Sequence, residues 1–476
     1  MLLAAIGPAL AQTMARPGWA GSGLNAETWW QHAVFLKIDG GQKMKIDGSP
    51  ANQVDANHAP LHQDVDFKAI AGRLDGLQAI GIDALILPMP GLPAQVPAGT
   101  RARDPGADGT ANTASATAAK PDAMGDGSGA PHDLGDFDEL IRQASRHSMR
   151  VLLTFTASGD TGILPATAQF WLSRGVAGFE LVTPPETSPR DSQTMAQTLR
   201  KITGGAAGQR IVISNFNPDR SDSPASAAGR RETTLGGDGR HGDAAGAQLQ
   251  IDSRMSRIEL PEAANLRPLL AASVAEPNVF LEFHPPPAQA GSPGGNGALA
   301  KAVAAILLTT HSAALIDADE NLALPAGALP TPDAAEAWSA APPVPASRTA
   351  APAMTPRAAS LPGAELSDWY RQLSRLHHGN ATLEYGSVTT LNFDEQNALV
   401  WVSRPASSAG LAPAVVVACN LSATPVELSL SAAIKGLGLH GSFLRTLLRS
   451  DAAMGAQNLN LVTLPPFGVY IGELRR

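Results

Sequence analysis

Residues 150–160, RVLLTFTASGD, and residues 170–183, FWLSRGVAGFELVT, decide the fold. Each stretch contains a short apolar run, 151–155 and 176–182, and the chain between the runs has room for one helix ending near FWLSRG. Continuous apolar runs are typical of parallel strands that are covered on both faces. The two stretches therefore predict a strand–helix–strand unit of an α/β fold.

The same alternation of strands and helices continues on both sides of this unit. The segments that predict strands are, in chain order, 33–38, 83–87, 151–155, 176–182, 210–216, 248–251, 278–284 and 313–316. Eight such strands favour a closed (β/α)8 TIM barrel, with an open doubly wound sheet as the alternative. No glycine-rich dinucleotide or phosphate loop follows a predicted strand, which weakens the alternative.

After Gly379 the pattern changes to short apolar runs bounded by turns, from 388–393 to 469–474. This pattern predicts an antiparallel β-sandwich domain. We therefore divide the chain into an N-terminal tail at 1–28, a barrel at 29–378 and a C-terminal β domain at 380–476. The barrel segment also contains low-complexity stretches with too few large apolar side chains to form a core, at about 90–131, 218–247 and 325–362.

Composition limits the class of protein. Hydrophobic residues make up 44% of the 476 residues, which indicates a globular protein. The net charge of −8 argues against a nucleic-acid partner, since such a protein needs a basic surface. The single cysteine, Cys419, lies in an apolar run and is expected to be a buried core residue.

The first residues, MLLAAIGPALAQ, are apolar, and Ala9-Leu10-Ala11 fits the small-x-small rule for signal cleavage. We interpret this segment as a signal-peptide remnant, which predicts a periplasmic or secreted protein. No later stretch has the roughly 18 apolar residues of a membrane span, so no transmembrane segment is predicted.

The order of the segments resembles the α-amylase superfamily, glycoside hydrolase family 13. The segments that carry this resemblance are WWQHAVF at 29–35, DFKAIAGRLDGLQAIGIDALIL at 66–87, HDLGDFDELIRQASRHSMRVLLTF at 132–155, FWLSRGVAGFELV at 170–182, WYRQLSRLHHGN at 369–380, VVVACNLSATPVELSL at 415–430 and LVTLPPFGVYIGEL at 461–474. The resemblance implies a (β/α)8 barrel with a C-terminal β domain, and a role in carbohydrate metabolism.

The resemblance also implies three catalytic carboxylates at strand ends, and this chain lacks all three. The nucleophile position is Val182, the acid/base position is Asn215 and the third carboxylate position is Pro285. A retaining glycosidase needs two carboxyl groups about 5 Å apart. Valine, asparagine and proline supply none, so the resemblance implies a degenerate member.

Two glutamates are candidate substitutes for the missing carboxylates. Glu180 has the strand parity of the nucleophile position and is expected to point into the barrel, where a glutamate requires a polar partner. Glu282 has the same parity as His284. We regard His284, Glu180 and Asn215 as candidate ligand-binding residues. No histidine pair has the spacing of a metal site, so neither a metal nor a cofactor is predicted.

Two hypotheses follow. The first is an exported, non-catalytic pseudoenzyme of carbohydrate metabolism that binds an oligosaccharide or a protein partner. The alternative is an active hydrolase or transglycosidase of α-linked glucosides, in which Glu180 and Glu282 act as displaced carboxylates. The fold resemblance behind the alternative is an analogy, because one fold supports many functions.

Overall fold

One sheet of eight parallel strands forms the wall of the barrel, in the order β7-β6-β5-β4-β3-β2-β1-β8. Its strands are β1 Val34–Lys37, β2 Ala84–Pro88, β3 Arg150–Thr156, β4 Gly178–Val182, β5 Ile211–Asn215, β6 Leu249–Asp252, β7 Val279–Leu281 and β8 Ala314–Asp317. The end strands β7 and β8 lie beside each other, so the barrel is nearly closed. The predicted (β/α)8 barrel is confirmed, and the open sheet is excluded.

The computed structural model describes residues 29–38, 66–90, 134–156, 164–183, 187–206, 208–215, 246–258, 262–276, 278–283, 295–317, 362–391, 395–406, 412–451, 453 and 455–476. The expected signal segment and nearly all of the three low-complexity stretches lie outside these residues. None of the described helices is long and apolar enough to cross a membrane.

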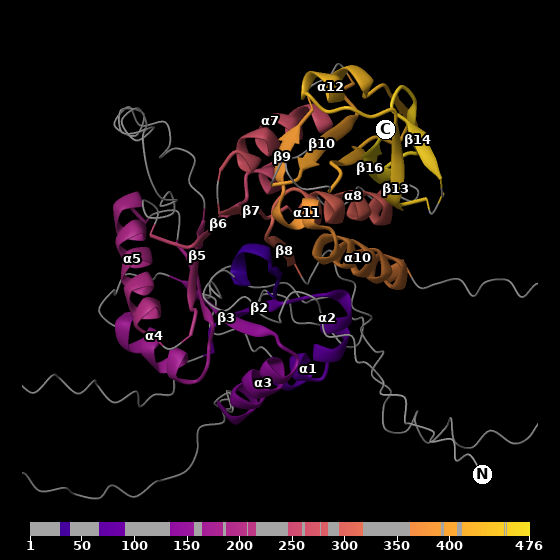
Figure 1. The fold of residues 1–476 in the computed structure, drawn as a ribbon. Helices are drawn as coiled ribbons and strands as arrows, with labels where there is room; N and C mark the ends of the chain where they lie inside the picture. The colour runs from indigo at the N-terminus through magenta and orange to yellow at the C-terminus, as the bar shows by residue number, and fades with distance from the viewer. Residues whose placement is uncertain are drawn as a thin grey trace, which may run out of the picture.

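Helices surround the barrel (Figure 1). They are α1 Phe67–Ala71, α2 Leu74–Ile80, α3 Leu134–Arg146, α4 Leu164–Ser173, α5 Pro189–Gly205, α7 Ala263–Val274, α8 Gly295–Thr309 and α10 Pro362–Gly379. The helical spacing at 66–80 covers two helices, because the N–H of Gly72 turns back to the carbonyls of Lys68 and Ile70 and ends α1. Gly81, with a φ of 98°, then ends α2.

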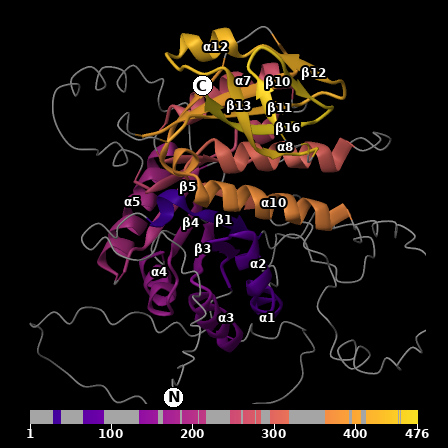
Figure 2. The same cartoon turned by 45° about the vertical axis from the view of Figure 1, so that its right-hand side comes forward.

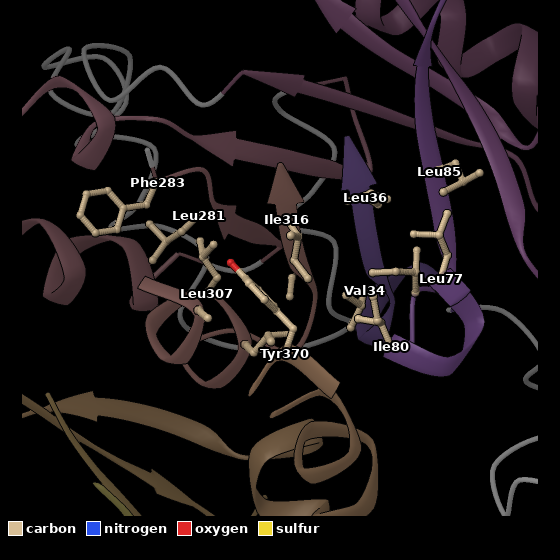
Figure 3. Close-up of a cluster of buried hydrophobic side chains, with 14 of the residues drawn as sticks. Val34, Leu36, Leu77, Ile80, Leu85, Leu281, Phe283, Leu307, Ile316 and Tyr370 are labelled. Carbon is tan, nitrogen blue, oxygen red and sulfur yellow. The ribbon is translucent and has the colours of Figure 1, made fainter. Parts of the chain in front are cut away.

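The strands have two apolar faces, because successive side chains of a strand point in opposite directions. One face forms the barrel lumen and includes Phe35, Ile86, Leu152, Ile213 and Phe280. The other face packs against the helices, and Figure 3 shows part of this outer core, including Val34, Leu36, Leu77, Leu85 and Tyr370. Because both faces of these strands are buried, their sequences are unbroken apolar runs.

Helix α8 lies between the barrel and the C-terminal domain (Figure 2). It contacts α10 and also strands β11 Val415–Asn420 and β16 Val469–Arg475 of that domain. Residues 302–308 are all buried, as expected for a helix that is apolar on every side. The indole Nε1 of Trp401 donates to the carbonyl of Thr309 at 3.2 Å, which fixes the end of α8 to the β domain.

The C-terminal domain is antiparallel, as predicted, with a six-stranded sheet β14-β13-β16-β11-β10-β9 and a two-stranded sheet β12-β15. Its remaining elements are β9 Ser387–Thr390, β10 Ala398–Arg404, β12 Val426–Leu428, β13 Phe443–Arg449, β14 Ala456–Asn458, β15 Val462–Leu464, and the helices α11 Ala381–Tyr385 and α12 Ser431–Gly436. The two helices were not predicted. Cys419 is fully buried in β11, as expected.

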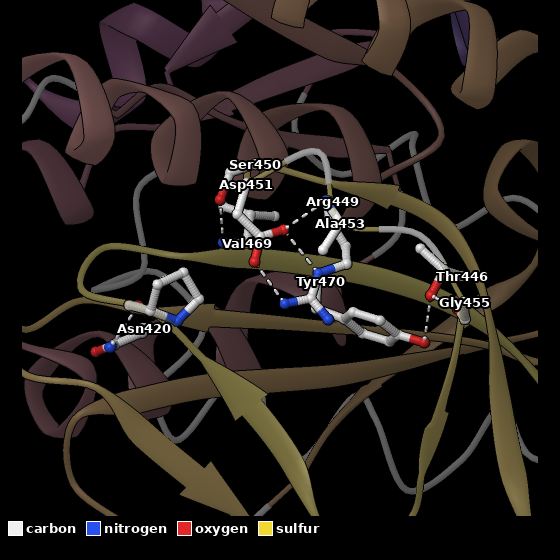
Figure 4. A network of polar contacts seen from close by, with 10 residues as sticks. Asn420, Thr446, Arg449, Ser450, Asp451, Ala453, Gly455, Val469 and Tyr470 are labelled. Atoms are coloured by element: carbon white, nitrogen blue, oxygen red, sulfur yellow. Dashed lines mark hydrogen bonds and ion pairs between the residues drawn. The ribbon is translucent and has the colours of Figure 1, made fainter.

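A polar network holds the end of β13 against β16 (Figure 4). The guanidinium of Arg449 donates to both carboxylate oxygens of Asp451, at 2.8 and 2.6 Å, and lies 5.5 Å from the ring centre of Tyr470. Thr446 donates to the Tyr470 hydroxyl at 3.3 Å. The register of β13 shifts between Thr446 and Leu448, so this network stabilises an irregular strand.

Candidate functional site

Four polar side chains meet in the upper barrel, toward the carboxyl ends of the strands. Lys37 ends β1, Thr154 lies in β3, Glu180 lies in β4 and Glu282 directly follows β7. We name these residues the Lys37 cluster. Barrel enzymes carry their chemistry at this end, and the alternation that sends Phe35 and Leu152 into the lumen also sends Lys37 and Thr154 there.

Lys37 bridges the two glutamates. Its Nζ lies 3.0 Å from Glu180 Oε1 in an ion pair, and it donates to Glu282 Oε1 at 3.2 Å. The Thr154 hydroxyl donates to the other oxygen of Glu180, Oε2, at 2.7 Å. The expectation that an inward Glu180 needs polar partners agrees with these contacts, which come from two other strands of the barrel.

Burial differs sharply within the Lys37 cluster. The side chain of Glu180 is only 1% exposed, whereas those of Lys37 and Glu282 are 12% and 18% exposed. Burial raises the pKa of Glu180 above its ordinary value, although the Lys37 charge and the Thr154 hydrogen bond act in the opposite direction. Glu180 is therefore held beneath the surface, and Glu282 is the more accessible carboxylate.

The other predicted site residues do not join this cluster in the described part of the chain. Val182 is half-buried at the end of β4, and Asn215 is exposed at the end of β5. Among the described residues, no hydrogen bond or ion pair joins Asn215 to the Lys37 cluster. His284 and Pro285, at two further predicted positions, lie outside the described residues.

Sequence reasoning missed Lys37, although a signal was present. Ala33, Phe35 and Lys37 alternate along the first strand, and Phe35 faces the lumen. The same parity directs Lys37 inward at the strand end, where a lysine needs a carboxylate.

The arrangement of the Lys37 cluster limits the reactions that its two carboxyl groups could catalyse. Oε1 of Glu180 and Oε1 of Glu282 can be no farther apart than their two distances to Lys37 combined, which is compatible with the roughly 5 Å of a retaining carboxyl pair. Lys37, however, occupies the space between them. Among the described residues no group of three histidine, cysteine or acidic side chains could hold a metal.

A separate pocket of about 300 Å³ lies near the opposite end of the barrel. Its lining includes His32, Glu276 and His311 from segments that flank the barrel strands, and Ser387 from β9. Burial lowers the pKa of His311 to about 4, so its imidazole is neutral at pH 7. No residue of the Lys37 cluster lines this pocket.

Comparison with solved structures gives similar folds at low sequence identity. Isomaltulose synthase from Klebsiella sp. LX3 is 13% identical, with a TM-score of 0.56 over 94% of this chain and 100% of that chain. The trehalulose synthase MutB from Pseudomonas mesoacidophila MX-45 is 14% identical, with a TM-score of 0.54 over 94% of this chain and 99% of that chain. A MutB variant in complex with glucose is 14% identical, with a TM-score of 0.55 over 94% of this chain and 100% of that chain.

No protein-family model and no curated protein matches this chain. At this level of identity the likeness defines the fold alone. The fold shared with these structures is a (β/α)8 barrel followed by a C-terminal β domain, the architecture that the resemblance to glycoside hydrolase family 13 implied.

Proposed function

We propose that the chain is a non-catalytic α-amylase-like protein that binds an oligosaccharide at the mouth of its barrel. The observation that carries the proposal is the position of Lys37, within 3.2 Å of both Glu180 and Glu282. An anomeric carbon would have to lie between two such carboxylates, and here an ammonium group lies there instead. Val182 at the nucleophile position adds to this argument.

Sugar binding is supported by the groups at the same end of the barrel. The exposed amide of Asn215 and the partly exposed carboxylate of Glu282 are suited to hydrogen bonds with hydroxyl groups. Two of the similar structures are MutB variants in complex with glucose and with isomaltulose. We further propose that the protein acts after export, which rests on the apolar segment that ends in Ala9-Leu10-Ala11.

Calorimetry with maltooligosaccharides, trehalose and isomaltulose, with a parallel assay for released reducing sugar, tests the proposal. We expect binding without release. Asn215→Ala should weaken binding by roughly tenfold, which corresponds to one or two lost hydrogen bonds. Asn460→Ala, an exposed asparagine of the C-terminal domain, is the matched control and should bind as wild type does. Absence of binding to every sugar would contradict the proposal and favour a protein partner.

One observation favours the alternative function, that of an active retaining hydrolase or transglycosidase. Glu180 has a raised pKa, as a general acid needs, and Glu282 lies close enough to act as its partner. Catalysis would require Lys37 to move away when substrate binds. Release of reducing sugar that Glu180→Gln and Glu282→Gln each abolish would establish this alternative and exclude the first proposal.

A further inference from the structure

Two arginines lie near the amino-terminal ends of the barrel strands, on the two sides of β4. Arg150 is the first residue of β3, and Arg210 directly precedes β5. The 3-10 helix η1, Trp29–His32, covers this region, with the Arg150 guanidinium 4.4 Å from the ring centre of Trp29. Because the strands are parallel, this region lies at the opposite end of the barrel from the Lys37 cluster.

Neither guanidinium has a counter-charge in the described part of the chain. No ion pair or hydrogen bond of either side chain is present there, and the Nε of Arg210 is buried without an acceptor. The other arginines with a buried, unbonded Nε each donate through Nη2 instead, namely Arg267 to Glu395 and Ala398, Arg404 to Thr389 and Arg475 to Glu473. Arg210 is therefore an exception among them.

This arrangement is unfavourable as it stands. Burial lowers the pKa of both guanidinium groups, and the charge of Arg210 lowers that of Arg150 further. Partly buried charges are normally paired, since desolvation without a partner is costly. Contact with Trp29 stabilises Arg150 but provides no acceptor for its N–H groups, and none is present among the described residues. An anion between the two arginines would supply both the missing charge and the missing acceptors.

We propose that Arg150 and Arg210 form a binding site for a tetrahedral oxyanion, such as inorganic phosphate or the phosphate group of a small metabolite. A guanidinium presents N–H groups in a planar fork that matches phosphate oxygens, and two of them favour a dianion over a monocarboxylate. Trp29, whose own N–H donates to the carbonyl of Gln209 at 3.3 Å, restricts the plane of Arg150. The site is independent of sugar binding at the barrel mouth.

Thermal unfolding of the full chain in phosphate, sulfate, glucose 6-phosphate or acetate, at one ionic strength held with sodium chloride, tests the site. Constant ionic strength removes general screening from the comparison. We expect the midpoint to rise with phosphate and sulfate concentration and to stay constant in acetate. Calorimetry with inorganic phosphate should show a single site, weakened roughly tenfold by Arg150→Gln or Arg210→Gln. A larger effect of glucose 6-phosphate would identify a phosphorylated metabolite as the better ligand.

In the absence of the anion, we expect the arginine substitutions to have the opposite effect on thermal stability. Arg210→Gln removes an uncompensated charge, so its unfolding midpoint in phosphate-free, low-salt buffer should be equal to or above that of wild type. Arg146→Gln, at an exposed position of α3, is the matched control and should keep the full response to phosphate. Glu282→Gln should also keep it, which separates this site from the barrel mouth. An equal phosphate response in wild type and Arg210→Gln would overturn the proposal.

Discussion

At the scale of single residues, Glu180 has two opposing influences on its charge. Burial in the barrel disfavours the carboxylate, while Lys37 at 3.0 Å and the Thr154 hydroxyl at 2.7 Å favour it. Burial has the larger effect, so the pKa in the folded state is raised above 4.5. The folded state then keeps its proton at pH values where the unfolded chain has lost it, and stability falls as the pH rises above 4.5 through the folded-state pKa.

Glu180→Gln should therefore become more stable relative to wild type as the pH rises from 4.5, by up to about 1.4 kcal/mol per pH unit until the folded-state pKa is passed. Urea unfolding of both proteins between pH 4 and pH 8 measures this difference. Glu427→Gln, at an exposed position of β12, controls for the loss of one carboxylate. If Glu180→Gln instead loses stability steadily above pH 5, the ion pair with Lys37 outweighs burial.

The same residues show what sequence can predict of a site. Strand parity placed Glu180 in the lumen, because a two-residue period needs only the local strand. The partner of Glu180 could not be predicted in this way, since Lys37 is far away along the chain and meets Glu180 only when the barrel closes. The lack of carboxylates at Val182 and Asn215 could be read directly, because it depends on residue type alone.

At the scale of elements, Gly178 explains why β4 begins with a glycine. Its φ is 153°, and an added Cβ would lie 2.1 Å from the carbonyl oxygen of Ile211 in the adjacent strand β5. The glycine thus permits a close approach of two backbones at the start of the strand. A side chain at this position would force the two strands apart.

Gly178→Ala should destabilise the protein by roughly 2 to 4 kcal/mol, because the clash is with backbone that has little room to move. Gly76→Ala is the matched control, since Gly76 lies inside α2 and an added Cβ meets nothing within 4 Å. That substitution should stabilise by roughly 0.5 to 1 kcal/mol, the usual difference between glycine and alanine in a helix. Equal effects of the two substitutions in chemical denaturation would contradict the assigned role of Gly178.

The type of a helix or strand could be predicted wherever its apolar pattern was long and regular. The residues at which helices and strands begin and end could not be predicted. Phe67, Ile70, Leu74 and Leu77 have the spacing of one continuous helix, but Gly72 divides the segment into α1 and α2. Helices α11 and α12 are too short to give a periodic signal, so they were missed. Short elements depend on caps and on tertiary contacts more than on their own pattern.

At the scale of the whole molecule, the barrel and the β domain share one core through α8. Residues of α8, of the barrel helices and of one face of the β domain belong to a single apolar cluster, whereas the other face of the six-stranded sheet packs on the two-stranded sheet. The sequence indicated only that α8 is apolar on every side. It could not indicate which two layers cover the helix, because that depends on contacts between distant segments.

Two adjacent valines of β11 test whether this shared core makes unfolding cooperative. Val417 faces the cluster that contains α8, Val416 faces the other cluster, and both are fully buried. Either change to alanine should cost roughly 2 kcal/mol, from lost burial and the cavity left behind. Since α8 couples the two parts, we expect both variants to lower the hydrogen-exchange protection of the β4 amides by this amount. Val417→Ala alters the shared core directly, so Val416→Ala is the decisive variant. If Val416→Ala reduced protection in the β domain but left β4 as in wild type, the β domain would unfold on its own, and α8 would be a contact surface between separate folding units.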